Sequence, residues 1–353
     1  MSHPLIQLAA ERDVRHSTGF RSAAAKLDGA ALAADYEKER ASAPRLHAEG
    51  KRYFVKRSGK PAEERRRNKD EDHVGQALVR HCRESGEGLA FPDDEFTLLP
   101  LDHQIRVKSG PADDPATKGI GRLDLLGVTS DDRLAVIRMR VLEPTATRCG
   151  VGDTPLRALL EGLAYTAIAS ANQEELKSEI AERFGRTVSG DPPLLVLLAS
   201  PTYWRLCRKR EAQKGAAWIK EMERLATDIE TEVGPSVRYV GLELSGDPGW
   251  SYGEDGPVLT GTPRLGLAWE PGAGRVKPKP RPRPKPTSPA DQIIEADLSR
   301  PIRAYSLVDS FSAGDRIDHS KLGLGVVQGI AGPGKIRVKF EEKDSILVHE
   351  RSP

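Results

Sequence analysis

The sequence predicts a mixed α/β domain joined by a proline-rich tether to a small C-terminal β-barrel. Between residues 70 and 244, candidate helices and strands alternate in an order typical of a mixed sheet with helical crossovers. Residues 276–289 alternate proline with lysine or arginine, which favours an extended polyproline II segment without a core. Residues 305–353 regain short alternating strands separated by glycines, a pattern typical of a small barrel.

The composition fits about two domains without a strong overall charge. The chain has 353 residues, and 54 Lys and Arg residues nearly balance 52 Asp and Glu residues, for a net charge of +2. This balance excludes a protein surface that is basic throughout, so any contact with nucleic acid must come from a local basic patch. No stretch approaches the ~18 apolar residues of a membrane span, and the N-terminus does not read as a signal peptide. We therefore expect a soluble cytoplasmic protein without a membrane partner.

The three cysteines, Cys82, Cys149 and Cys207, are scattered along the chain and form no CxxC pair. An odd, scattered set of this kind predicts reduced thiols and offers no zinc site.

Residues 1–50 are rich in alanine and charged residues, which favours a helix. Leu27, Leu32 and Tyr36 form one thin apolar stripe, so we expect this segment to lean on the following domain. Residues 50–60 predict a short β-hairpin closed at Ser58 and Gly59.

The main domain begins with a predicted helix over 70–84, where Val74, Leu78 and Cys82 have helical spacing. Asp153 or Thr154 is the expected N-cap of a strong later helix, with Pro155 in its first turn. The predicted order is helix 70–84, strands 95–107 (broken at Pro100), 121–128 and 133–142, helix 153–171, strand 194–200, helix 208–232 and strand 236–244. We therefore predict a helical segment over 1–50, a main domain over 51–245, a linker over 246–304 and a barrel over 305–353.

Polar side chains interrupt two of these apolar strands. Asp124 lies in the strand GRLDLLG at 121–127, and Arg138 and Arg140 lie in the strand AVIRMRV at 135–141. Period-2 alternation puts both arginines on one face of their strand. Together with the element order, these strands resemble the PD-(D/E)xK nuclease superfamily, or restriction-endonuclease-like fold, over roughly residues 65–245. The resemblance implies a mixed sheet that carries a Mg²⁺-dependent phosphodiesterase site.

The resemblance assigns catalytic positions to Asp124, Arg138 and Arg140. Asp124 matches the first acidic residue of the family, but Arg138 stands where the family has its second acid, and Arg140 where it has its lysine. We therefore expect weak or lost cleavage. Two guanidiniums beside a single carboxylate should also repel a divalent cation and attract an anion.

Other carboxylates offer a migrated metal site. Glu161 and Tyr165, spaced four apart, resemble the Gln-x-x-x-Tyr motif of RecB-like members, with Glu in place of Gln. Glu71 matches an extra acidic residue on the first helix of the family, and Glu143 follows the third strand. The resemblance thus implies Glu161 and Tyr165 as further catalytic residues, and Asp124, Glu71 and Glu143 as possible Mg²⁺ ligands.

Each of these residues also has a structural interpretation. Asp124 could form a salt bridge with Arg138 or Arg140 that locks the sheet, and the two arginines could form a solvated strand face. Glu71 and Glu161 could be ordinary surface residues of helices, and Tyr165 a core aromatic.

The C-terminal segment carries a second resemblance. The matching positions are Phe311, Gly314, Asp315, His319, Gly323, Gly325, Val327, Lys335, Val338, Phe340 and Leu347. They resemble the Tudor/SH3-like tail of UvrD-type repair helicases, which implies a module that binds a protein partner, RNA polymerase or the repair machinery. His319 and Phe340 are the candidate partner-binding residues, with His319 alternatively a hydrogen-bonding residue of a turn.

The tether offers a local basic patch at Lys277, Lys279, Arg281, Arg283 and Lys285. These side chains could bind the phosphates of a nucleic acid, or act only as a solubilising spacer. We thus consider a nuclease-fold protein of DNA metabolism recruited through its barrel, a non-enzymatic adaptor with the same parts, and a purely structural protein.

Overall fold

The computed structural model describes residues 3–55, 70–93, 96–108, 117–208, 217–270 and 293–350. The chain is a mixed α/β protein that divides into two compact units, Met1–Lys277 and Pro278–Pro353. The first unit holds a seven-stranded mixed sheet, and the second holds a separate five-stranded sheet.

The seven-stranded sheet combines an antiparallel part with a parallel part. Its order is β1 (Leu89–Ala90), β2 (Thr97–Arg106), β3 (Arg122–Thr129), β4 (Leu134–Arg140), β5 (Leu194–Ala199), β6 (Val237–Glu243) and β9 (Arg264–Leu267). Strands β1 to β4 are antiparallel neighbours, β4, β5 and β6 are parallel, and β9 returns antiparallel at the edge. Helical connections separate the parallel strands, as parallel pairing requires. The predicted break at Pro100 is confirmed as an irregularity between Pro100 and Asp102.

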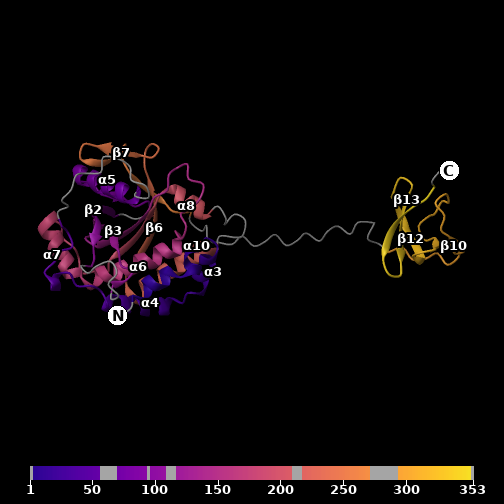
Figure 1. The fold of residues 1–353 in the computed structure, drawn as a ribbon, viewed down its shortest axis with the longest axis horizontal. Helices are drawn as coiled ribbons and strands as arrows, with labels where there is room; N and C mark the ends of the chain where they lie inside the picture. The colour runs from indigo at the N-terminus through magenta and orange to yellow at the C-terminus, as the bar shows by residue number, and fades with distance from the viewer. Residues whose placement is uncertain are drawn as a thin grey trace. The chain divides into compact units, whose positions relative to one another are not determined.

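Helices cover both faces of this sheet (Figure 1). The helices α6 (Pro155–Ala171), α10 (Ala217–Val233), α3 (Gly19–Lys26) and α4 (Gly29–Ala41) lie on one side, here called the α6 face. The helix α5 (Asp70–Ser85) lies on the other, the α5 face, with the hairpin of β7 (Trp250–Gly253) and β8 (Gly256–Leu259). Along β4, Leu134 and Val136 join the core of the α6 face, whereas Ala135, Ile137 and Met139 join that of the α5 face.

The N-terminal segment is helical, as predicted, but it is built into the large unit. The described residues 3–50 form α1 (Pro4–Ala10), α2 (Arg12–Arg15), α3, α4 and a 3-10 turn at His47–Glu49. Leu5, Phe20 and Leu32 are buried in the same core as α6. The buried Glu39 anchors the start of the chain, since it contacts the His3 ring at 2.5 Å and accepts from the Leu5 amide at 3.3 Å.

The predicted linker over 246–304 is wrong at both ends. Residues 250–267 contain β7, β8 and β9, and β9 extends the large sheet. These strands are only four residues long, so their alternation is too brief to detect in the sequence. Residues 293–304 belong to the C-terminal unit, where the Gln328 side chain pairs with the backbone of Ile294.

Two helices were not expected. The helix α7 (Gln173–Phe184) follows α6 after Asn172, and α8 (Pro201–Arg208) precedes α10 where a single helix over 208–232 was predicted. The predicted hairpin closure at Ser58 and Gly59, and the tether at 276–289, lie outside the described residues.

The C-terminal unit is a five-stranded sheet around a small core. Its strands are β10 (Arg303–Ala304), β11 (Arg316–His319), β12 (Gly323–Gly332), β13 (Lys335–Phe340) and β14 (Asp344–Val348). Ile317, Val327, Ile336 and Val338 are fully buried in it. Glycine is required at position 325, because a Cβ there would lie 2.6 Å from the Phe340 ring.

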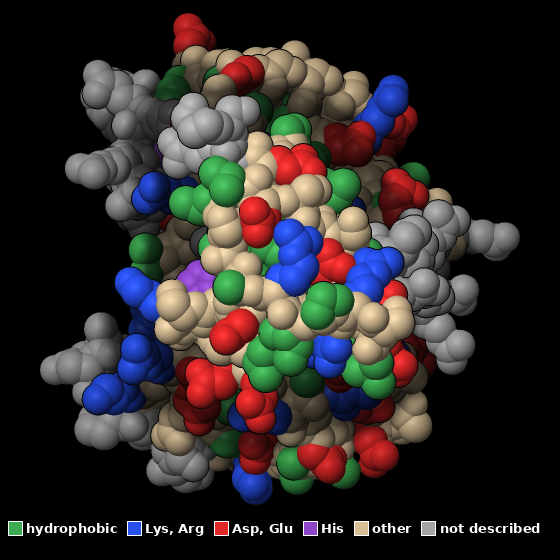
Figure 2. Space-filling view, turned by 90° about the vertical axis from the view of Figure 1, so that its right-hand side faces the viewer, with side chains coloured by type: hydrophobic (Ala, Val, Ile, Leu, Met, Phe, Trp, Pro, Cys, Tyr) green, Lys and Arg blue, Asp and Glu red, His purple; other side chains and the backbone are tan. Residues whose placement is uncertain are grey.

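The surface mixes both signs of charge. On the face that Figure 2 shows, Lys and Arg side chains alternate with Asp, Glu and hydrophobic ones. This distribution agrees with the net charge of +2. Among the described helices, none combines the length and the hydrophobicity that crossing a bilayer demands.

Candidate functional site

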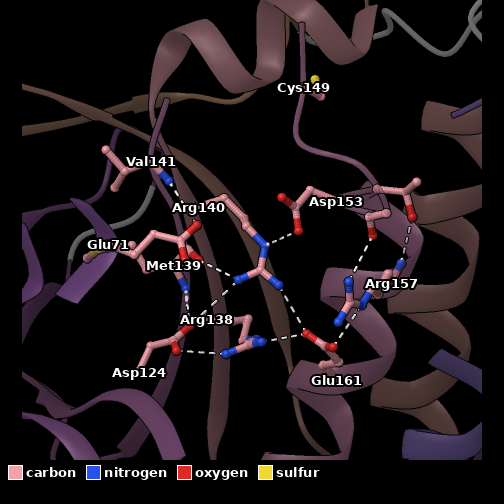
Figure 3. A network of polar contacts seen from close by, with 12 residues as sticks. Glu71, Asp124, Arg138, Met139, Arg140, Val141, Cys149, Asp153, Arg157 and Glu161 are labelled. Atoms are coloured by element: carbon pink, nitrogen blue, oxygen red, sulfur yellow. Dashed lines mark hydrogen bonds and ion pairs between the residues drawn. The ribbon is translucent and has the colours of Figure 1, made fainter. Parts of the chain in front are cut away.

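The candidate site lies on the α6 face, where the ladder between β3 and β4 ends (Figure 3). The last paired residues are Leu125 and Ile137. One position further, Asp124 and Arg138 lie opposite each other, and Asp124 Oδ2 accepts a hydrogen bond from the Met139 amide at 2.9 Å. The carboxylate thus satisfies a backbone donor that the ladder no longer reaches, as a buried amide requires.

Arg138 bridges two carboxylates. Its Nη1 donates to Asp124 Oδ1 at 2.7 Å, and its Nη2 donates to Glu161 Oε2 on α6 at 2.5 Å. All three side chains are between 12% and 14% exposed. The guanidinium therefore occupies the space between the two acidic groups and ties both strands to the crossover helix.

Two further arginines complete the network around Glu161. Arg140 Nη2 donates to Glu161 Oε2 at 3.0 Å, and Arg157 Nε donates to Glu161 Oε1 at 2.9 Å. The other side of Arg140 faces Asp153, with Nε 3.6 Å from Oδ1. Three guanidiniums are thus matched by the carboxylates of Asp124, Asp153 and Glu161.

The pKa of Glu161 reflects the three arginines around it. Burial alone would raise its pKa, but the charges of Arg138, Arg140 and Arg157 outweigh burial and lower the pKa to about 2. Burial would likewise lower the pKa of Arg138, yet Asp124 and Glu161 raise it. Both partners are therefore held in their charged forms.

The remaining predicted residues differ in their positions. Glu71, in the first turn of α5, accepts from the Val141 amide at 3.4 Å, and burial raises its pKa. Glu143 instead lines a separate depression with Asp70 and Ser200. Glu71 thus lies close enough to Asp124 to interact with it electrostatically, whereas Glu143 lines the separate depression. Among the described residues, these three carboxylates do not form a group that could hold a metal ion.

Tyr165 is buried and makes contacts that hold two elements together. It is 4% exposed, and its hydroxyl oxygen accepts a hydrogen bond from the Gly121 amide at 3.0 Å. The Arg138 guanidinium lies 5.5 Å from the centre of its ring. Its contacts hold the start of β3 against α6.

The residues present do not fit Mg²⁺. This ion needs several oxygen ligands in a near-octahedral arrangement. Across the described residues, no group of three or more His, Cys, Asp or Glu side chains is arranged to hold a metal ion. Between Asp124 and Glu161, a guanidinium already uses the oxygens that would coordinate a cation.

The structure changes the charge count behind the expected anion site. That expectation counted two arginines against one carboxylate. In the structure, Glu161 and Asp153 approach from α6 and from the segment before it, and together with Asp124 they neutralise the guanidiniums. The charges of the three arginines are therefore matched within the network, although the Nε atoms of Arg138 and Arg140 are buried without a hydrogen-bond partner among the described residues.

Sequence reasoning missed Asp153 and Arg157. Arg157 lies four residues before Glu161 on one helix, a spacing that predicts an ion pair. Asp153 was considered only as an N-cap. Thr154 takes that role by accepting from the Arg157 amide at 3.1 Å, so Asp153 can face Arg140.

The other candidate residues lie elsewhere. Lys277, Lys279, Arg281, Arg283 and Lys285 lie outside the described residues. In the C-terminal unit, His319 Nδ1 accepts from the Lys321 amide at 3.1 Å, and its ring stacks on Tyr305. Phe340 is 4% exposed and belongs to the core.

Comparison of the chain with protein families, with curated proteins and with solved structures finds no match.

Proposed function

We propose that this chain is a pseudonuclease of DNA metabolism. A restriction-endonuclease-like unit has exchanged its metal site for a salt-bridge network. A Tudor/SH3-like barrel recruits the chain to a protein partner. The observation that carries the proposal is the Arg138 guanidinium between Asp124 and Glu161.

The element order supports the nuclease ancestry. A helix, three long antiparallel strands, a crossover helix and a parallel strand follow one another as α5, β2, β3, β4, α6 and β5, with the two-residue β1 before β2 and α7 before β5. Asp124 lies on the second of the three strands and Arg138 on the third, at the positions of the family's acids. The fold is thus compatible with the family, while the side chains oppose its chemistry.

Loss of cleavage follows from the network. Hydrolysis of a phosphodiester by such a site requires a cation that activates water and neutralises charge. A guanidinium can neutralise charge, but it cannot coordinate a water and lower its pKa as a metal ion does. Arg138 is also held by two ion pairs in a partly buried setting, where removing one partner is costly. We therefore assign the network to stability rather than catalysis.

The test is a cleavage assay with the full chain. Plasmid and single-stranded DNA are incubated with Mg²⁺ or Mn²⁺, beside the variant Asp124→Asn, with circular dichroism verifying that the variant folds. We expect no cleavage above that of the variant and no heat of Mg²⁺ binding by calorimetry. Metal-dependent cleavage that Asp124→Asn abolishes would overturn the proposal.

The barrel supplies the second half of the proposal. A groove of about 460 Å³ on this unit is lined by apolar side chains, among them Ile302 and Leu324, which are 49% and 59% exposed. Exposed apolar side chains that gather at one place are typical of a surface for a protein partner. From the resemblance to helicase tails, we propose RNA polymerase or a repair factor as that partner.

Binding of the full chain to purified RNA polymerase tests this part. We expect Leu324→Asp to weaken binding at least tenfold, because a charge would enter an apolar contact. The matched control is Ile346→Asp, a 63% exposed position on β14 that does not line the groove. Equal binding by both variants would count against the groove, and no binding by the wild type would count against the polymerase.

A further inference from the structure

Two cysteines far apart in the sequence meet in the large unit. Cys149 and Cys207 are separated by 58 positions, yet their Sγ atoms lie 3.6 Å apart. Cys149 lies in the connection from β4 to α6, and Cys207 lies at the end of α8, which follows β5. Because β4 and β5 are parallel neighbours, with Arg140 beside Ala199, both connections leave the same edge of the sheet.

The pair lies at a cavity of about 390 Å³. Cys149 is half-buried, whereas Cys207 is 9% exposed. The cavity is also lined by Arg15, Arg21 and Arg148, with Asp153 as an acidic counterpart. A small molecule can therefore approach Cys149 first, and the arginines favour one with negative charge.

The two thiols differ in reactivity. The contact with Cys149, together with burial, raises the pKa of Cys207 well above its usual range. Because Cys149 is the more exposed of the two, it is the sulfur that a reagent in the cavity meets first, and its thiolate is the attacking nucleophile. The third cysteine, Cys82, lies in the core of the α5 face, where burial raises its pKa to about 11.

The geometry allows the two sulfurs to bond. A disulfide has a sulfur–sulfur distance of about 2.04 Å, so the present distance of 3.6 Å must shorten. Cys207 is held in α8, but the connection around Cys149 contains no helix or strand between Val141 and Thr154. We therefore expect the Cys149 segment, rather than α8, to move when the two sulfurs approach each other.

We propose that Cys149 and Cys207 are a dithiol site that a small anionic disulfide oxidises reversibly. The Cys149 thiolate attacks one sulfur of the reagent, forms a mixed disulfide and releases one thiolate. Cys207 then loses its proton and attacks the Cys149 sulfur, which releases the second thiolate. Two cysteine thiols are oxidised to one disulfide, the reagent is reduced to two thiols, and these take up the two protons. The product ties the β4–α6 connection to α8.

Oxidised glutathione is the probe, used with the full chain. We expect the number of titratable thiols in the denatured protein to fall from three to one, and peptide mapping to link Cys149 with Cys207. Dithiothreitol should restore all three. In the matched control Cys82→Ser, the count should fall from two to zero, while Cys149→Ser should form no internal disulfide.

Three persisting thiols, or a stable glutathione adduct on Cys149 that Cys207 does not displace, would overturn the proposal. The preference for an anion is tested with Arg148→Ala. We expect this variant to react about threefold more slowly with oxidised glutathione, as loss of one nearby charge implies. Its rate with the neutral disulfide of 2-mercaptoethanol should not change. Equal slowing with both reagents would remove the role given to the arginines.

Discussion

Glu161 shows how one carboxylate can link acid stability to the whole network. Its pKa is lowered from the usual 4.5 to about 2. A depressed pKa in the folded state stabilises the fold above pH 4.5, and this contribution is lost as the pH falls toward 2. The shift corresponds to roughly 3 kcal/mol, at 1.36 kcal/mol per pKa unit. Glu71 acts in the opposite direction, because burial raises its pKa.

The variant Glu161→Gln should remove this pH dependence. We expect it to lower the free energy of unfolding by roughly 3 kcal/mol at pH 7 and to flatten its decline between pH 5 and pH 2.5. Urea denaturation at several pH values measures both effects. The control is Glu232→Gln at an exposed position of α10. An unchanged pH profile in Glu161→Gln would mean that the arginines do not hold the charge of this carboxylate.

Arg138 is the residue on which both acids of the site depend. Its replacement by methionine keeps an unbranched, largely apolar stem but leaves Asp124 and Glu161 without their bridging cation. Breaking a buried pair on one side costs about 3–5 kcal/mol, so we expect a loss of that order in urea denaturation. Arg40→Ala, which removes an exposed pair with Glu37, should stay within about 1 kcal/mol of wild type. A loss from Arg138→Met as small as that of the control would contradict this account.

At the scale of elements, the N-terminal helices are held by close packing on α10. A Cβ on Gly29, at the start of α4, would lie 2.5 Å from the Asp228 Cβ. Asp228 pairs with Arg224 at 2.8 Å, and Arg224 also donates to the Ala24 and Leu27 carbonyls at the end of α3. Glycine therefore lets α4 approach α10 without disturbing the arginine that binds α3.

We expect Gly29→Ala to destabilise the large unit by about 1–3 kcal/mol, although alanine is the better helix former. Thermal and urea denaturation measure the change. Gly190→Ala is the matched control, since nothing lies within 4 Å of the Cβ it would add. A stabilised Gly29→Ala protein would show that the helices can separate at little cost.

At the scale of the whole molecule, the two units should unfold independently. The C-terminal unit has a small core, and below about 60 residues such domains are only marginally stable. Ile336→Ala in that core should cost about 2–5 kcal/mol. Calorimetry should then show two transitions. The smaller one should move to a lower temperature or disappear, while the larger one keeps its temperature. Ile346→Ala, at an exposed position, serves as the control. A single transition that shifts as a whole would contradict independent units.

The strong local patterns were predictable from the sequence. The helix over 70–84, the three strands before α6 and the cap of α6 follow from periodicity and capping residues, which act over a few positions. Period-2 alternation likewise put Arg138 and Arg140 on one face. The short strands β7, β8 and β9 were missed, because four residues carry too little alternation.

What the sequence determined by itself is the order of α5, α6, α10 and the strands β2 to β6, the separate C-terminal strands and the replacement of one expected acid by Arg138. Only the tertiary structure decided what Arg138 does. The bridge to Glu161 depends on how α6 packs over the ends of β3 and β4, and the approach of Cys149 to Cys207 depends on the parallel pairing of β4 and β5. Both contacts join residues that local patterns cannot relate, because chain folding, rather than spacing along the chain, brings them together.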